Sequence, residues 1–210
     1  IELECCNILE KEISKEKSDI VFFEYYKEFS NRTVRVKTYE DPKLTHLDGD
    51  QNSFFIYDMR TITAWGKLYS KQILDEIFFD EKMRKAEDVD FNFRIYSRVK
   101  KATYLNKPLL HYRILMKSEI HGYDALIKEK IEYPIYKLRK WKQDDEIKHY
   151  AYYSFAAIAY ILICQNGIYL NSEITKKQKL KEIKALNKND WVKDLFSNVD
   201  KVKIPKSRKT

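Results

Sequence analysis

The hydrophobic pattern of the 210-residue chain changes near residue 118, and this change constrains the fold more than any other feature. Before it, runs of β-branched and aromatic residues have the length and composition of strands, and helical spacing is confined to segments between them. After it, apolar residues recur every three or four positions, which is the spacing of helices. The sequence therefore predicts an α/β domain over residues 1–117, a helical subdomain over 118–200 and a basic tail over 201–210.

Local patterns divide the first part into elements. Apolar spacing predicts a helix up to about residue 17, and residues 19–26 are rich in β-branched and aromatic side chains without glycine, as in a strand buried on both faces. Residues 33–39 read as a half-exposed strand in a hairpin with it. We interpret the rest as a loop over 41–51, helices over 70–76 and 86–99, and two short strands over 103–105 and 109–115 around a turn at 106–108. The expected fold is a mixed sheet with flanking helices.

The remaining chain reads as four helices, at about 121–142, 145–166, 173–187 and 190–197. The longest apolar run, residues 150–164, has 15 residues, fewer than the roughly 20 that span a bilayer. We therefore interpret it as the core helix of the subdomain.

Glycine and cysteine usage exclude several functions. The four glycines lie too far apart for a phosphate-binding loop or a dinucleotide-binding fingerprint. The three cysteines, Cys5, Cys6 and Cys164, show no recurring spacing, which argues against a disulfide framework or a zinc site and favours a reducing compartment.

The net charge of +8 is concentrated at the C-terminal end. Residues 171–210 hold twelve Lys and Arg and five Asp and Glu, which gives +7 and leaves +1 for the rest. This charge is consistent with attraction to an anionic membrane surface or with a solvated helix face followed by a basic tail. Nucleic acid is not an expected partner, because the lysines lack interleaved aromatic residues. We expect a cytoplasmic protein with peripheral contact to the inner face of the plasma membrane.

Three clusters, at residues 63–69, 85–91 and 108–114, could carry chemistry. Each has a structural interpretation when it is taken alone. Trp65 can be core, Glu87 and Asp88 can be acids favoured by a helix dipole, and His111 can be a strand residue with a hydrogen-bonded ring.

Together, in this order and separation, the clusters resemble the second half of a family 2 glycosyltransferase of the GT-A fold, of the kind that builds bacterial capsules and other surface polysaccharides. The resemblance covers residues 1 to about 120. The matching residues are Trp65, Lys67, Leu68 and Tyr69 of a Trp–Lys–Leu–Tyr segment, Glu87 and Asp88 of an acidic pair that opens a helix, and His111, Tyr112 and Arg113 at a strand end.

The resemblance implies transfer of a sugar, with inversion, from a nucleotide-diphosphate sugar to a hydroxyl of a glycan or lipid-linked acceptor. This chemistry needs a carboxylate that takes the acceptor proton and groups that stabilise the leaving diphosphate. The resemblance assigns the base to Asp88, with Glu87 as a neighbour that orients the acceptor or holds a basic side chain. Asp90 is the competing candidate for the base.

The other residues that the resemblance implies for substrate binding lie in the first and third clusters. His111 and Arg113 are candidates for the diphosphate, and they point to the same side of a strand because they alternate with Tyr112. Trp65 offers a flat face for a sugar ring with Lys67 nearby, although a packed Trp at a strand end is equally consistent with the sequence.

The donor half of the family pattern has no match. The family carries a nucleotide-binding region closed by an Asp-x-Asp motif, whereas Asp48-Gly-Asp50 lies downstream of the place expected for it. We therefore expect a chain that lacks its N-terminal donor-binding half and is inactive by itself, and Mn²⁺ or Mg²⁺ is implied by the resemblance alone.

The alternative function is that of a non-catalytic helical module that docks on a membrane or a partner enzyme. Convergence of Asp88, His111, Arg113 and Trp65 on one cleft would favour the enzyme.

Overall fold

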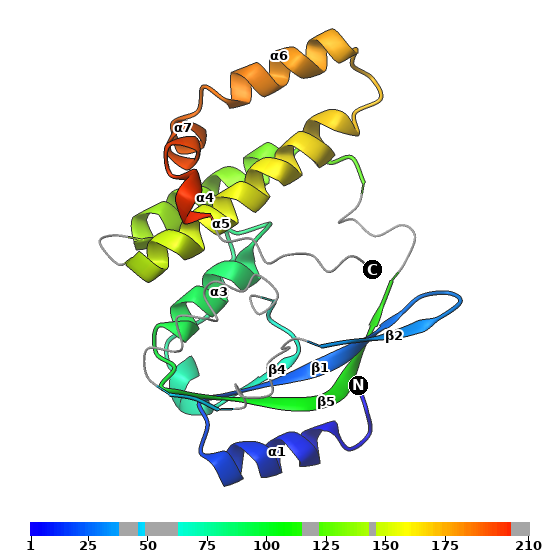
Figure 1. Ribbon diagram of the computed structural model, residues 1–210, viewed down its shortest axis with the longest axis vertical. Coiled ribbons are helices and arrows are strands. Elements are labelled where there is room, and N and C mark those ends of the chain that lie inside the picture. The colour runs from blue at the N-terminus through cyan, green and yellow to red at the C-terminus, as the bar shows by residue number, and fades with distance from the viewer. Residues whose placement is uncertain (38–45, 49–62, 115–121, 143–145, 203–210) are drawn as a thin grey trace. The chain divides into compact units, whose positions relative to one another are not determined.

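The structure is a computed structural model that describes residues 1–37, 46–48, 63–114, 122–142 and 146–202 (Figure 1). It divides into two compact units. The first unit takes in the described residues up to Phe79 and those from Asp88 to Ile114, and the second takes in Asp80–Glu87 and the described residues from Gly122 onward.

The first unit is built on a mixed five-stranded sheet. Its central strands, β1 (Ile20–Glu28) and β5 (Lys101–Arg113), run parallel, and β3 (His46–Asp48) pairs antiparallel with β5. Two short strands, β2 (Thr33–Val36) and β4 (Lys67–Tyr69), pair antiparallel with β1. Because β2 pairs with the second half of β1 and β4 with its first half, these two strands follow one another along the same edge of β1.

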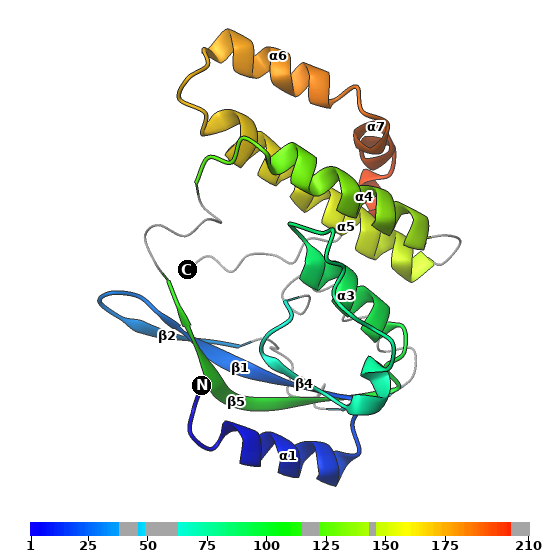
Figure 2. The same cartoon turned by 180° about the vertical axis from the view of Figure 1, so that it is seen from behind.

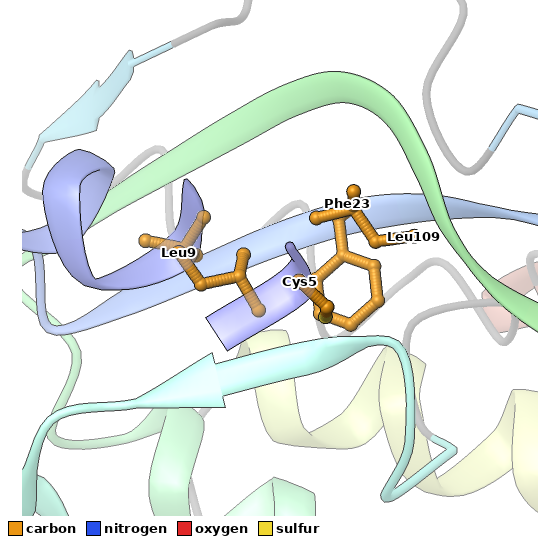
Figure 3. Close-up of a cluster of buried hydrophobic side chains, with 5 residues drawn as sticks. Cys5, Leu9, Phe23 and Leu109 are labelled. Atoms are coloured by element: carbon orange, nitrogen blue, oxygen red, sulfur yellow. The ribbon is translucent and has the colours of Figure 1, made fainter. Parts of the chain in front are cut away.

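Helices cover both faces of this sheet, with α1 (Cys5–Glu16) on one face and α3 (Glu87–Tyr96) on the other (Figures 1 and 2). Cys5 and Leu9 of α1 pack against Val21, Phe23 and Leu109 of the strands, and Figure 3 labels four of these residues. Each buried Leu, Val or Phe contributes about 1.5–3 kcal/mol. On the opposite face, the ring of Phe22 lies 6.2 Å from that of Tyr96 in α3. Adjacent residues of β1 thus point into two cores, which confirms a strand buried on both faces.

The predicted turn at residues 106–108 is wrong, because β5 continues through it as a single strand. Pro108 has no N–H to donate to the sheet, and the pairing of β1 with β5 shifts register on both sides of its partner Glu24. The turn-forming residues therefore mark a β-bulge and not a hairpin.

Two shorter elements also differ from the prediction. The segment interpreted as a loop over 41–51 contains β3 at His46–Asp48, a three-residue strand too short to leave a periodic pattern. The helix expected over 70–76 is a single 3-10 turn, η4 (Lys71–Leu74), and Ser70 makes no side-chain cap there.

The second unit is helical, which confirms the predicted change of class after the sheet. Its elements are α4 (Ile127–Lys142), α5 (Glu146–Leu162), the π-helix η5 (Ile163–Tyr169), α6 (Lys176–Leu186), α7 (Asp190–Ser197) and the 3-10 turn η6 (Val199–Lys201). Asp194 of α7 ties three helices together, since it accepts hydrogen bonds from Lys142 at the end of α4 and from the Tyr153 hydroxyl of α5 at 3.3 and 3.1 Å.

One helix among the described residues, Lys148–Tyr169, is long and apolar enough to cross a membrane by length and composition. However, 61% of its most apolar 18-residue stretch is buried inside the fold, and Ala151, Tyr152 and Ala156 have no exposed surface. This burial favours the interpretation of the helix as the core of the unit.

Candidate functional site

Hydrogen bonds join the first two predicted clusters, because Tyr69 at the end of β4 reaches the first turns of α3. The Tyr69 hydroxyl donates to Asn92 Oδ1 at 2.7 Å, and Asn92 Nδ2 donates to the backbone oxygen of Asp88 at 2.8 Å. Asn92 is fully buried, so both sides of its amide are engaged away from water. This bridge holds the turn that carries Glu87 and Asp88 against β4. Asn92 is not among the predicted site residues, although its position one helical turn after Asp88 in the sequence indicates such a contact.

Asp88 is half-buried in the first turn of α3, and Glu87 beside it is exposed. Negative charge is favoured at this end of a helix. Burial, together with the nearby charge of Asp88, raises the pKa of the Tyr69 hydroxyl, which keeps that group protonated and able to donate to Asn92. Ala86, just before the helix, has a φ of 61°, a backbone conformation that costs a non-glycine residue energy. The chain thus turns sharply into the helix at the position of the two acids.

Asp90, the competing candidate for the base, is held in a buried ion pair. Its Oδ2 accepts hydrogen bonds from Arg94 Nε at 3.0 Å and Nη2 at 2.8 Å, and only 3% of Asp90 is exposed. Arg94 Nη2 also donates to the backbone oxygen of Phe78 at 2.7 Å. Asp90 therefore has a structural role, which its i,i+4 spacing to Arg94 signals in the sequence. The assignment of the base to Asp88 stays a prediction.

Trp65 belongs to an aromatic cluster on the sheet. Its ring stacks on Tyr112 with centroids 5.1 Å apart and an angle of 18°, and Tyr25 meets it edge-on at 4.8 Å. Gly66 follows with a φ of 76°, which a residue with a side chain would adopt only under strain, and its carbonyl accepts a hydrogen bond from Phe23. This conformation lets Trp65 lie over Tyr112 while Lys67 begins β4. All three rings of the cluster are partly exposed.

Lys67 is engaged within its own loop. Its ammonium donates to the backbone oxygen of Thr63 and lies 5.6 Å from the centre of the Phe22 ring. The side chain closes the turn that carries Trp65, and a role in binding a phosphate or hydroxyl would require it to leave these partners.

His111 lies on the other face of the sheet from this cluster, because it is adjacent to Tyr112 in β5. Its Nδ1 is 2.7 Å from a Glu28 carboxylate oxygen and its Nε2 is 2.8 Å from one of Glu2. Arg113, the exposed last residue of β5, lies on the same side as His111 by alternation. The structure therefore does not bring His111 to Trp65, and a diphosphate at His111 would have to displace two carboxylates.

These contacts predict a pH-dependent contribution of His111 to stability. Hydrogen bonds to Glu2 and then to Glu28 raise the pKa of His111 above its usual 6.5. The protonated ring therefore stabilises the folded chain fully below about pH 6.5, and this contribution is lost as pH rises through the raised pKa. Because the ring is 38% exposed, we expect less than about 1 kcal/mol. Thermal melts of the wild type and His111→Gln across this window should converge as pH rises. A difference that does not depend on pH would contradict the assignment.

One cavity in the described part of the chain lies away from the predicted site residues. A cavity of about 750 Å³ opens between α1 and β4 and is lined in part by Leu9, Leu68 and Tyr69, but not by Asp88, Trp65 or the end of β5. Among the same residues, no group of three or more His, Cys, Asp or Glu side chains could hold a metal ion. Asp50 lies outside the described residues. The implied Mn²⁺ or Mg²⁺ therefore stays a prediction.

The fold, a mixed sheet followed by helices, is similar to that of solved glycosyltransferase structures. The solved structures similar to it include S. aureus TarS 1–349, a glycosyltransferase, in complex with UDP-GlcNAc. That match has a TM-score of 0.63 and 19% identity and covers 94% of this chain and 55% of TarS. A second structure of TarS 1–349 matches with a TM-score of 0.58, 17% identity and coverage of 94% and 53%.

At these identities the likeness shows the fold alone, and the chain spans about half the length of the TarS structures. No protein-family model matches the sequence, and no curated protein matches it.

Proposed function

We propose that this chain supplies the acceptor side and the catalytic base of a family 2 glycosyltransferase that transfers a sugar, with inversion, in surface polysaccharide synthesis. The observation that carries the proposal is the placement of Asp88, a half-buried carboxylate on a helix turn held by Tyr69 and Asn92, in a fold similar to that of TarS. A base in this reaction must be ionised, accessible and fixed in position. Asp88 is half-buried on a fixed helix turn, and Asp90 lies in a buried ion pair with Arg94.

The proposed reaction begins with the acceptor hydroxyl. The acceptor hydroxyl oxygen attacks the anomeric carbon of the donor, and the Asp88 carboxylate takes its proton. The bond between the anomeric carbon and the diphosphate breaks, and the diphosphate leaves with the electron pair. Glu87, exposed beside Asp88, orients the acceptor hydroxyl. The stacked rings of Trp65 and Tyr112 offer an apolar face for a sugar, whereas Arg113 lies on the opposite face of the sheet.

The test is a transfer assay on the protein expressed from its own gene. It uses a panel of UDP-, GDP- and dTDP-sugars, beginning with UDP-GlcNAc because TarS is solved with it, and glycans with free hydroxyls as acceptors. Parallel reactions with added Mn²⁺ and with a chelator report any need for a metal.

We expect release of a nucleoside diphosphate that depends on the acceptor, and a product whose anomeric configuration, read by NMR, is opposite to that of the donor. Retained configuration would exclude inversion and a base role for Asp88. Acceptor binding with no transfer from any donor would support the alternative, a docking module without catalysis.

A further inference from the structure

The exposed face of α6 is unusually basic. Residues 176–188 hold six lysines and one glutamate, a net charge of +5. Within α6, Lys177, Lys181 and Lys184 follow the i, i+4, i+7 spacing of a single helix face, and all three are exposed. The opposite side holds Leu186, which is 3% exposed. These three lysines therefore form one stripe that points away from the fold.

This lysine stripe has no counter-charge in the described residues. None of its three ammonium groups forms an ion pair there. Like charges at these spacings destabilise a helix by a few tenths of a kcal/mol per pair. The helix is nevertheless preformed, because Thr175 and Gln178 make a reciprocal capping box at its start. A rigid stripe of uncompensated positive charge is complementary to an anionic surface.

An apolar side chain borders the stripe. Leu180 is 53% exposed and lies within one helix turn of Lys177, Lys181 and Lys184. Near the start of the helix, Tyr169 at the end of η5 is 72% exposed, and Lys179 Nζ lies 5.5 Å from the centre of its ring. Leucine and tyrosine gain free energy at the boundary of headgroups and acyl chains, whereas a soluble polyanion offers them no apolar phase.

We propose that α6 docks the protein on an anionic lipid bilayer, with the lysine stripe against the headgroups and Leu180 at the acyl boundary. In Figures 1 and 2, α6 lies at the edge of the helical unit. The proposal does not depend on sugar transfer. Each lysine near an anionic leaflet strengthens binding by roughly fivefold, so three lysines account for about 10²-fold.

The test is co-sedimentation of the full chain with lipid vesicles. Vesicles with about one-third phosphatidylglycerol are compared with pure phosphatidylcholine vesicles at low and high salt. We expect binding to the anionic vesicles only, and less of it at high salt. The triple variant Lys177→Gln, Lys181→Gln, Lys184→Gln should lose about 10²-fold in binding. Leu180→Ser should lose several-fold while leaving the charge unchanged.

The matched control removes three exposed lysines from the first unit, with Lys11→Gln, Lys71→Gln and Lys107→Gln. It carries the same net charge as the test variant and should bind within about twofold of the wild type if the stripe is the contact. An equal loss in the control would show that only net charge matters and would overturn the proposal. Equal binding to both kinds of vesicle would also overturn the proposal. Binding to polyphosphate that is as tight as binding to vesicles, and that Leu180→Ser leaves unchanged, would overturn it as well.

Discussion

Replacement of Asp88 by asparagine lowers the rate of sugar transfer by about 10²- to 10⁴-fold, the usual contribution of a general base. The amide keeps the shape of the side chain but cannot take the acceptor proton. Asn92 donates to the backbone oxygen of residue 88, so the substitution leaves the bridge from Tyr69 intact. The loss should therefore appear in kcat at nearly unchanged KM.

The matched control for this prediction is Asp75→Asn, the same change at an exposed aspartate of the same unit, and it should leave transfer unchanged. Glu87→Gln distinguishes the role of Glu87 from that of Asp88. Replacement of a residue that only orients the acceptor raises KM more than it lowers kcat. Full activity in Asp88→Asn together with its loss in Glu87→Gln would move the base to Glu87.

Replacement of Arg35 by leucine lowers the free energy of unfolding by about 3–5 kcal/mol. Arg35 Nε donates to Glu24 Oε2 at 2.5 Å, and the Tyr104 hydroxyl donates to Glu24 Oε1 at 2.5 Å. Glu24 has no exposed surface, so removal of the guanidinium leaves a buried carboxylate with one neutral partner. The same change frees the Asn106 side-chain oxygen, which Arg35 Nη2 contacts at 2.6 Å. Urea unfolding measures the loss.

Arg32→Leu is the control for this substitution, because Arg32 is exposed and its guanidinium only lies 5.0 Å from the centre of the Phe29 ring. It should cost less than about 1 kcal/mol. The double variant Glu24→Met, Arg35→Leu removes both charges and should recover most of the stability. If Arg35→Leu were no worse than Arg32→Leu, Glu24 would not depend on this ion pair.

Local periodicity predicted several elements well. The residues of α7 match the predicted segment 190–197, and β1 begins and ends within two residues of its predicted limits, because apolar spacing and β-branched runs are properties of neighbouring residues. The prediction of one strand pair over 103–115 failed for a physical reason. The tripeptide at 106–108 has the composition of a turn, and its pairing with β1 makes it a bulge instead.

In the candidate site, too, some features follow from the local sequence and others from tertiary packing. The sequence by itself determined that carboxylates open α3, that aromatic and basic residues precede it, and that a helical unit with a basic end follows the sheet. Only the tertiary structure decided that Asn92 ties Asp88 to β4, that Glu24 is buried against Arg35, and that His111 faces Glu2 and Glu28 and not Trp65. Glu2 and His111 are 109 positions apart in the chain. Contacts at such separations depend on how strands and helices pack, and spacing within a short segment carries no information about them.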